Sequence, residues 1–175
     1  QYLFFKQWRA LKTYANRLGI RVFGDMPIYV AMDSSDCWSS PGVFQLDSDL
    51  KPTAVAGVPP DYFSRDGQLW GNPLYDWKAM KKTGYAWWIN RLRAMGDYYD
   101  LIRVDHFIGF ANYYAVPYGA STARTGCWRR GPGRHFLSRV KKELPQLNII
   151  AEDLGAVNHK VKLLLDYCGY PGMKV

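Results

Sequence analysis

The sequence predicts an α/β fold built on parallel strands, because short apolar runs alternate with helical patterns along the chain. Two runs, residues 101–104 and 147–151, are rich in branched side chains, which is typical of strands buried on both faces. Each run ends in a carboxylate, since Asp105 follows the first and Glu152 follows the second. Reacting groups of parallel α/β proteins gather at the carboxyl ends of strands, so the sequence predicts a site there.

The first half of the chain predicts one helix and one strand before a long irregular stretch. Apolar side chains recur at helical spacing over residues 4–18, and Gly19 is placed to end that helix. Residues 20–23 then predict a strand, with Asp25 just beyond its end. Residues 26–82 show little periodicity and much Pro, Gly, Asp and Ser, and a loop this long is usually functional.

The second half predicts two strands set between helices. Its predicted elements are a helix over 85–95, the strand that delivers Asp105, an irregular stretch over 108–133, a short helix over 136–144, the strand that delivers Glu152, and a closing helix over 157–168 followed by Gly169 and Pro171. Parallel strands connect by right-handed crossovers, so both irregular stretches should lie on the face that carries Asp25, Asp105 and Glu152.

The positive charge of the chain would permit a polyanionic partner such as a nucleic acid, but its distribution points to an ordinary solvated surface. The net charge is +8 and the pI about 9.4. The basic residues are dispersed, with local clusters over 78–82, 129–134 and 141–142 and no long basic stripe. A solvated basic surface is therefore favoured over nucleic-acid binding, and salt-sensitive binding to random DNA is the test that would separate the two.

The cysteines predict neither a zinc site nor a disulfide framework. Cys37, Cys127 and Cys168 are odd in number, far apart and without a CxxC pair. Reduced thiols fit a cytoplasmic protein, with a plastid as the alternative if a transit peptide precedes Gln1. No apolar run approaches the roughly eighteen residues of a membrane span, so no membrane partner is expected.

Six short motifs stand in order along the chain: residues 24–30 (GDMPIYV), 55–63 (VAGVPPDYF), 70–75 (WGNPLY), 103–107 (RVDHF), 151–155 (AEDLG) and 171–175 (PGMKV). Together they resemble the amylomaltase family, the 4-alpha-glucanotransferases of the α-amylase clan. The resemblance implies a (β/α)8 barrel, a retaining transfer reaction with α-1,4-glucans as donor and acceptor, and no cofactor or metal. It gives no expectation for the oligomeric state.

The length of the chain predicts part of a barrel. A complete (β/α)8 barrel needs about 250 residues, whereas this chain has 175, opens inside a helical pattern at Gln1 and stops at Val175 where a strand starts. We therefore expect residues 1–175 to be a partial catalytic domain with about three parallel strands, long βα loops, and barrel parts missing at both ends. The resemblance places a third catalytic carboxylate, the stabiliser of the transition state, beyond Val175.

Asp105 is the expected nucleophile. A retaining enzyme uses two carboxyl groups about 5–5.5 Å apart, one attacking the sugar carbon and one protonating the departing oxygen. The resemblance implies that the aspartate of the Arg-x-Asp-His motif attacks. Arg103 lies two residues earlier, so on a strand it points to the same side as Asp105 and would keep that carboxylate ionised. The alternative is a purely structural Arg103–Asp105 ion pair.

Glu152 is the expected general acid and base. The chain has only two glutamates, and Glu143 lies in a solvated basic run. An acid must hold its proton near neutral pH, which requires burial or a neighbouring negative charge such as that of Asp105. Loss of that charge when Asp105 is glycosylated would suit Glu152 to act as a base. The neighbouring Asp153 should point away and be structural.

The resemblance implies further contacts with the sugar. Asp25 matches a substrate-binding aspartate, although a turn-capping role explains it equally well on local grounds. His106 resembles a histidine that donates to a sugar hydroxyl. The family often has Arg where this chain has Ile108, which puts details of the acceptor side in question rather than the reaction.

Aromatic residues make up 16% of the chain, and sugar rings pack their C–H faces against aromatic rings. Tyr62, Phe63 and Trp70 resemble loop residues that line the glucan groove, whereas Asn72 would hold the shape of that loop. A covering aromatic loop would displace water and so favour transfer. A retaining α-glucan hydrolase of the same clan is the nearest alternative, because its carboxylates would be identical, and a non-catalytic sugar-binding remnant is a third.

Overall fold

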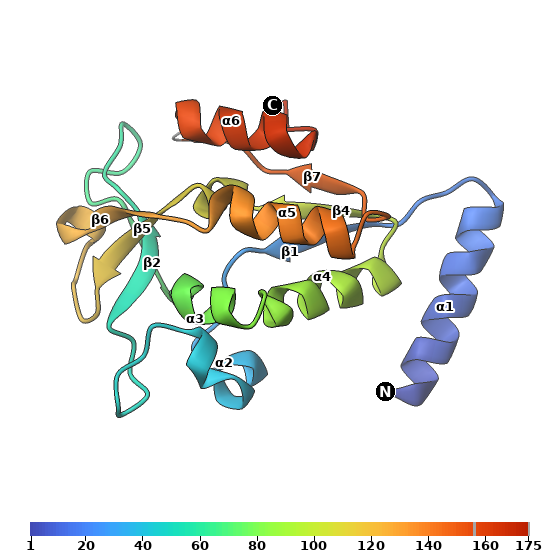
Figure 1. The fold of residues 1–175 in the computed structure, drawn as a ribbon, viewed down its shortest axis with the longest axis horizontal. Coiled ribbons are helices and arrows are strands. Elements are labelled where there is room, and N and C mark those ends of the chain that lie inside the picture. The colour runs from blue at the N-terminus through green and yellow to red at the C-terminus, as the bar shows by residue number, and fades with distance from the viewer. Residues whose placement is uncertain (156, 175) are drawn as a thin grey trace.

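The computed structural model describes residues 1–155 and 157–174. The strands of these residues form two sheets, one of three parallel strands and one of four strands (Figure 1). The order of the parallel sheet is β1-β4-β7, and that of the second sheet is β3-β2-β5-β6. The strand expected to start at Val175 lies outside the described residues.

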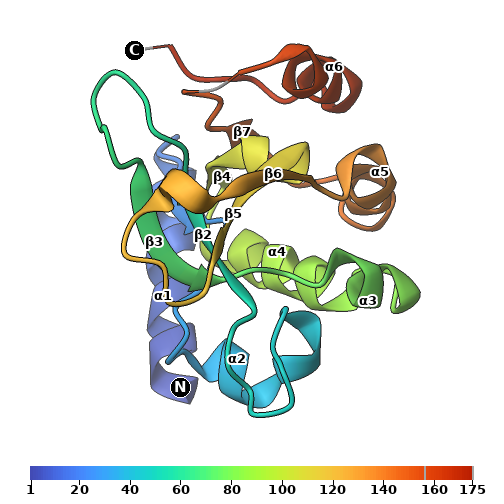
Figure 2. The same ribbon diagram turned by 90° about the vertical axis from the view of Figure 1, so that its left-hand side faces the viewer.

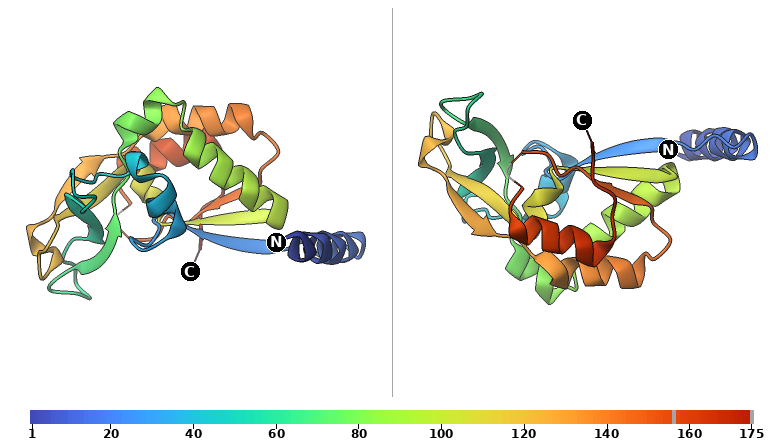
Figure 3. Two further views of the ribbon diagram at one scale, coloured as in Figure 1. Left: turned by 90° about the horizontal axis from the view of Figure 1, so that it is seen from below. Right: turned by 90° about the horizontal axis from the view of Figure 1, so that it is seen from above.

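The parallel sheet confirms the predicted three strands. They are β1 (Phe23–Pro27), β4 (Leu101–Asp105) and β7 (Ile149–Ala151), and β4 is central. Helix α4 (Ala86–Tyr98) precedes β4 and helix α5 (Gly133–Glu143) precedes β7. Both helices lie along one side of the strands (Figure 3).

The strands β1 and β4 bury one face rather than both. Met26, Ile102 and Val104 are buried, whereas the alternate positions, Asp25, Arg103 and Asp105 among them, are partly or fully exposed. The expectation of a strand buried on both faces is therefore wrong for β4, because helices cover one face while the other carries charged side chains.

The first strand begins later than the predicted 20–23. Asp100 accepts a hydrogen bond from the backbone N–H of Val22 at 2.7 Å, and Phe23 then pairs with Leu101, so pairing starts at Phe23. Asp25 consequently lies inside β1, opposite Arg103 in the register, rather than beyond the strand. This position corrects the prediction that Asp25 lies beyond the strand, and it places Asp25 next to Arg103.

Helix α1 (Tyr2–Arg17) is amphipathic but contains no buried residue. Gly19, at φ 76°, follows its end as predicted. The helix extends away from the rest of the molecule in both views (Figure 3). The indole N–H of Trp8 donates to the carbonyl of Tyr98 at 3.0 Å, and this bond ties α1 to the end of α4.

The two stretches expected to be irregular together build the second sheet (Figure 2). The first stretch supplies β2 (Ala54–Val58) and β3 (Gln68–Pro73), and the second supplies β5 (Asn112–Pro117) and β6 (Cys127–Arg130). Their short helices are α2 (Ser35–Ser39), η1 (Pro41–Val43), α3 (Trp77–Lys82), η2 (Phe107–Phe110) and η3 (Ala123–Thr125). Antiparallel pairing of β2 with β5 joins the two stretches, so the prediction that they are irregular is wrong for these four strands.

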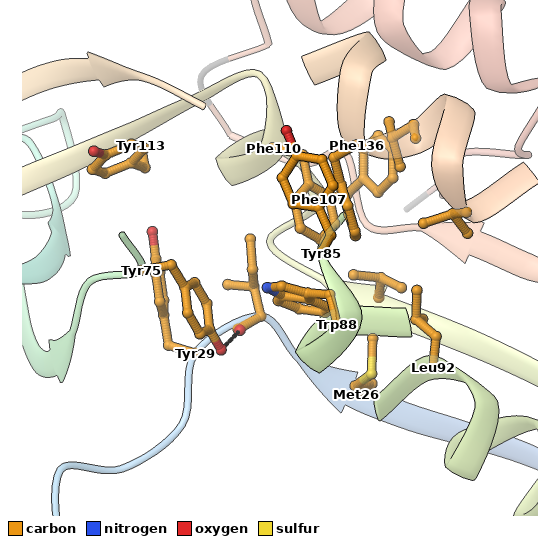
Figure 4. Close-up of a cluster of buried hydrophobic side chains, with 14 of the residues drawn as sticks. Met26, Tyr29, Tyr75, Tyr85, Trp88, Leu92, Phe107, Phe110, Tyr113 and Phe136 are labelled. Atoms are coloured by element: carbon orange, nitrogen blue, oxygen red, sulfur yellow. Dashed lines mark hydrogen bonds between the residues drawn. The ribbon is translucent and has the colours of Figure 1, made fainter. Parts of the chain in front are cut away.

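A cluster of buried side chains rich in aromatic rings forms the hydrophobic core (Figure 4). Trp88 is fully buried, and its ring meets the edges of Tyr75 and Phe110 at centroid distances of 5.4 and 5.2 Å. Burying each such side chain stabilises the fold by about 1.5–3 kcal/mol. The closing helix α6 (His159–Cys168) ends at Gly169 in the left-handed conformation, as predicted.

Candidate active site

The two carboxylates lie at the ends of neighbouring strands. Asp105 is the last residue of β4, and Glu152 directly follows β7. Val104 and Ala151 are partners in the parallel register, so the carboxylates follow paired positions on strands about 4.8 Å apart. The N–H of Glu152 also donates to the carbonyl of Val104 at 3.0 Å. The structure thus brings the two predicted residues to one edge of the sheet.

Backbone groups hold the Glu152 side chain, which is only 8% exposed. Its Oε2 accepts the N–H of His106 at 2.8 Å, and its Oε1 accepts the N–H of Leu154 at 2.9 Å. One donor follows β4 in the chain and the other follows β7. Glu152 is therefore fixed in orientation by the backbone of the two strand ends rather than by another side chain.

The guanidinium of Arg103 joins two carboxylates. Its Nη1 lies 2.6 Å from Oδ1 of Asp25, and its Nη2 lies 2.8 Å from Oδ1 of Asp105. The hydrogen bond that Arg103 donates to Asp25, partly offset by burial, and the charges of both aspartates raise the pKa of Arg103 above its ordinary value. Arg103 and Asp105 do point to the same side of β4, as their spacing predicts. Arg103 also donates a hydrogen bond to Asp25 on the neighbouring strand β1.

His106 follows Asp105 in the left-handed conformation, at φ 52°. Its ring is buried, and its Nε2 has no hydrogen-bond partner among the described residues. Burial lowers the pKa of His106 to about 4, against the opposing effect of the Asp105 charge. The imidazole is therefore neutral at neutral pH.

The aromatic residues divide into two groups. Trp70 belongs to β3 rather than to a loop, and its ring lies edge-on to His106 at 4.8 Å. Tyr62 and Phe63, on the connection between β2 and β3, are 98% and 94% exposed and contact each other at 5.7 Å. The structure therefore brings Trp70 to the site, whereas Tyr62 and Phe63 are exposed to solvent and contact each other.

Asn72 links β3 to the segment that follows β1. Its side-chain N–H donates to the carbonyl of Val30 at 2.9 Å, which agrees with the expected shape-holding role. Ile108, where the family often has Arg, is buried in η2 and belongs to the hydrophobic core. The departure thus places an apolar side chain in the core.

Three further residues near this site have no role that the sequence predicts. Tyr29 lies between the rings of His106 and Tyr75, at 6.4 and 5.9 Å, and burial raises its pKa strongly. Arg91 donates to the carbonyls of Pro27 and Ile28 at the end of β1. Met173 lies with its Sδ 3.2 Å from Nε of Arg103. Tyr29 and Met173 belong to motifs of the sequence, but only the folded contacts show what they touch.

Asp153 agrees with its expected structural role, since its Oδ1 accepts the N–H of Met173 at 2.8 Å. Cys37, Cys127 and Cys168 are free thiols in the structure. Among residues 1–155 and 157–174, no three His, Cys, Asp or Glu side chains are placed to hold a metal ion. None of the described helices combines the length and apolar character of a membrane span.

The parallel strands, their covering helices and the carboxylates at the strand ends define part of a (β/α)8 barrel. The chain belongs to the 4-alpha-glucanotransferase family, whose model matches residues 1–175. It is 55% identical over 175 residues to the 4-alpha-glucanotransferase of Streptococcus pneumoniae serotype 4, covering 100% of this chain and 35% of the relative. It is 48% identical to the chloroplastic/amyloplastic 4-alpha-glucanotransferase DPE1 of Arabidopsis thaliana, covering 100% of this chain and 30% of the relative.

Solved structures agree. The amylomaltase from Streptococcus agalactiae in complex with acarbose superposes with a TM-score of 0.95 at 47% identity, covering 100% of this chain and 35% of that one. The amylomaltase from Corynebacterium glutamicum gives a TM-score of 0.85 at 27% identity, covering 98% and 24%. The chain thus spans about a third of the length of the first curated relatives that it matches.

Proposed function

We propose that this chain carries the nucleophile and the general acid/base of a retaining 4-alpha-glucanotransferase. The observation that supports this most directly is the placement of Asp105 and Glu152 at register-paired strand ends. The ion pair from Arg103 to Asp105 and the family membership add to it. Residues 1–175 would form part of the catalytic barrel domain.

The proposed reaction has two steps. In the first, an Asp105 oxygen bonds to C1 of the donor sugar, the bond from C1 to the bridging oxygen breaks, and Glu152 gives its proton to that oxygen. In the second, Glu152 takes the proton of an acceptor hydroxyl, whose oxygen bonds to C1 while Asp105 leaves. The products are a shortened donor and a lengthened acceptor with the original configuration.

The surrounding groups would bind the glucan. Arg103 would keep the Asp105 carboxylate ionised and oriented. Asp25, which pairs with the same guanidinium, would accept hydrogen bonds from sugar hydroxyls. The neutral His106, which directly follows Asp105, would contact a sugar hydroxyl through the small part of its side chain that is exposed. Trp70 would pack against a sugar face, and the exposed Tyr62 and Phe63 would close over an incoming acceptor.

The proposed donors and acceptors are α-1,4-linked maltooligosaccharides, with starch or glycogen breakdown products as their source. The amylomaltase from Streptococcus agalactiae is in complex with acarbose, which supports a sugar ligand for this chain. The proposed chemistry uses no cofactor. A cytoplasmic or a plastid location would fit, since one relative is named as chloroplastic/amyloplastic.

The test uses a chimera in which this chain replaces the matching third of the Streptococcus pneumoniae relative, because their identity is 55%. With maltotriose, we expect products longer than the substrate. Glucose and maltose alone would show the hydrolase alternative, which the transferase names of the relatives do not favour. No turnover by a folded chimera, beside an active unmodified relative, would contradict the proposal.

A further inference from the structure

The guanidinium of Arg103 has a third contact that the proposed reaction does not use. Its Nε lies 3.2 Å from Sδ of Met173, while its two terminal nitrogens donate hydrogen bonds to Asp25 and Asp105. A thioether is a neutral, weak hydrogen-bond acceptor. The N–H edge of the guanidinium is therefore occupied by a group that adds no negative charge.

Two contacts hold Met173 in this place. The carbonyl of Pro171 accepts the N–H of Ala151 at 2.9 Å, which joins the segment to β7. The N–H of Met173 donates to Oδ1 of Asp153 at 2.8 Å. Both anchoring residues, Ala151 and Asp153, flank Glu152 in the chain, so the segment is fastened on either side of the proposed acid/base.

Gly172 is required for this arrangement. A Cβ atom at Gly172 would overlap the carboxylate of Asp153. The close approach of the backbone to that carboxylate is what allows the N–H of the next residue, Met173, to reach it. Asp153 therefore controls where Met173 lies through a contact that only glycine permits.

We propose that Met173 is a positioning residue for the nucleophile, acting through Arg103. The thioether occupies the Nε edge of the guanidinium of Arg103. The two terminal nitrogens of Arg103 are therefore held in a single orientation towards Asp25 and Asp105. A carboxylate in the place of Met173 would compete for the charge of Arg103, whereas a neutral and flexible thioether fills the space without competing. The proposal rests on the proposed function, because it assigns Met173 to the step in which Asp105 attacks.

The expected effect is on chemistry rather than on glucan affinity. Met173→Leu keeps the apolar bulk but removes the acceptor, so it should lower kcat by about tenfold with KM changed by less than about twofold. Met173→Gln has a similar length and restores an acceptor oxygen. We expect it to recover kcat to within about threefold of the unmodified chimera.

The experiment measures kcat, KM and the thermal midpoint of the chimera and three variants. Met95→Leu is the matched control, because Met95 is a partly buried methionine of α4 that packs on the core, away from Arg103. The rate at which a maltosyl fluoride forms the adduct on Asp105 is the second readout. It should slow in Met173→Leu and remain unchanged in Met95→Leu, with similar thermal midpoints.

Three outcomes would overturn the proposal. Met173→Leu could match Met95→Leu in the rate of adduct formation, or Met173→Gln could be as slow as Met173→Leu although folded. An adduct on Asp105 in the unmodified chimera, together with either result, would leave the proposed function intact and remove only the role of Met173. The third outcome, no adduct at all in a folded and unmodified chimera, would remove both.

Discussion

Arg103 joins carboxylates from two strands, with its terminal nitrogens 2.6 Å from Asp25 and 2.8 Å from Asp105. The contact with Asp105 could be predicted, because residues two apart on a strand share a face. The contact with Asp25 could not, because it depends on which residue of β1 lies opposite Arg103. The contact with Met173 comes from a segment 70 positions further along the chain.

Replacing Asp105 with Asn should nearly abolish turnover by the chimera. The amide keeps the shape of the side chain but is not a nucleophile, so binding of maltooligosaccharides should stay within about an order of magnitude. Steady-state kinetics and calorimetric titration with acarbose measure the two properties. A variant that retains more than about a tenth of the activity would contradict the role of Asp105.

Glu152→Gln should block the cleavage of ordinary glucans but spare adduct formation from a glycosyl fluoride. Fluoride is a good leaving group and needs little help from an acid. Mass spectrometry of the peptic peptides should find the sugar on Asp105. An adduct on a different side chain would overturn the roles of both residues.

His106 should make the stability of the site depend on pH. Its pKa is about 4 when folded, below the ordinary value of 6.5, because it is buried. As the pH falls from about 6.5 to about 4, the unfolded chain gains a proton that the folded chain does not, so stability declines by up to about 3 kcal/mol. Above pH 6.5 this contribution stays constant.

The matched variant is His106→Asn, since asparagine tolerates the left-handed conformation found at φ 52°. Denaturant titrations of the chimera at pH 4, 5 and 7 give the free energy of unfolding. The difference between the unmodified chimera and the variant should shrink as the pH falls. An equal difference at all three pH values would show that the imidazole does not titrate in this way.

The elements could be predicted only where the pattern is local. The runs that end at Asp105 and Glu152 are apolar and short, and both are strands in the structure. The apolar pattern predicts the first strand too early, because residues 24–27, Gly-Asp-Met-Pro, have little preference for a strand and become one by pairing with β4. The antiparallel sheet was missed because its strands contain Gly and Pro and pair across the long distance between β2 and β5.

Gly57→Ala tests the coupling of that sheet to the site. A Cβ atom at Gly57 of β2 would overlap the carbonyl oxygen of Gln68 in β3. The two strands would have to separate, which should cost more than about 2 kcal/mol and should displace Trp70 and the connection that carries Tyr62. We expect a lower thermal midpoint for the chimera and a higher KM for acceptor sugars.

Gly42→Ala is the control, because a Cβ atom at Gly42 meets no atom within 4 Å and its φ is not positive. Both glycines lie in the part of the sequence that connects β1 to β4, and both substitutions add the same methyl group. The two variants should therefore differ in thermal midpoint and in acceptor KM. Equal behaviour would show that the close approach of β2 and β3 is not needed for the site.

The molecule as a whole exposes surfaces that a closed barrel would cover. The parallel sheet has the order β1-β4-β7, so the outer edges of β1 and β7 have no strand partner among the described residues. Helix α1 exposes 75% of Tyr2, 66% of Leu3 and 52% of Phe4. Unpaired strand edges and exposed apolar faces both favour association between copies.

The 175-residue chain expressed alone should therefore aggregate and should not make longer glucans from maltotriose. Three parallel strands cannot close a barrel, and groups that act as one catalytic unit fail together when any of them is absent. Size-exclusion chromatography and a maltotriose assay check both expectations, with the chimera as the positive control. A monodisperse monomer that makes longer products would show that these strands and carboxylates are sufficient for transfer, and the inference that residues 1–175 act as part of a larger barrel would then be wrong.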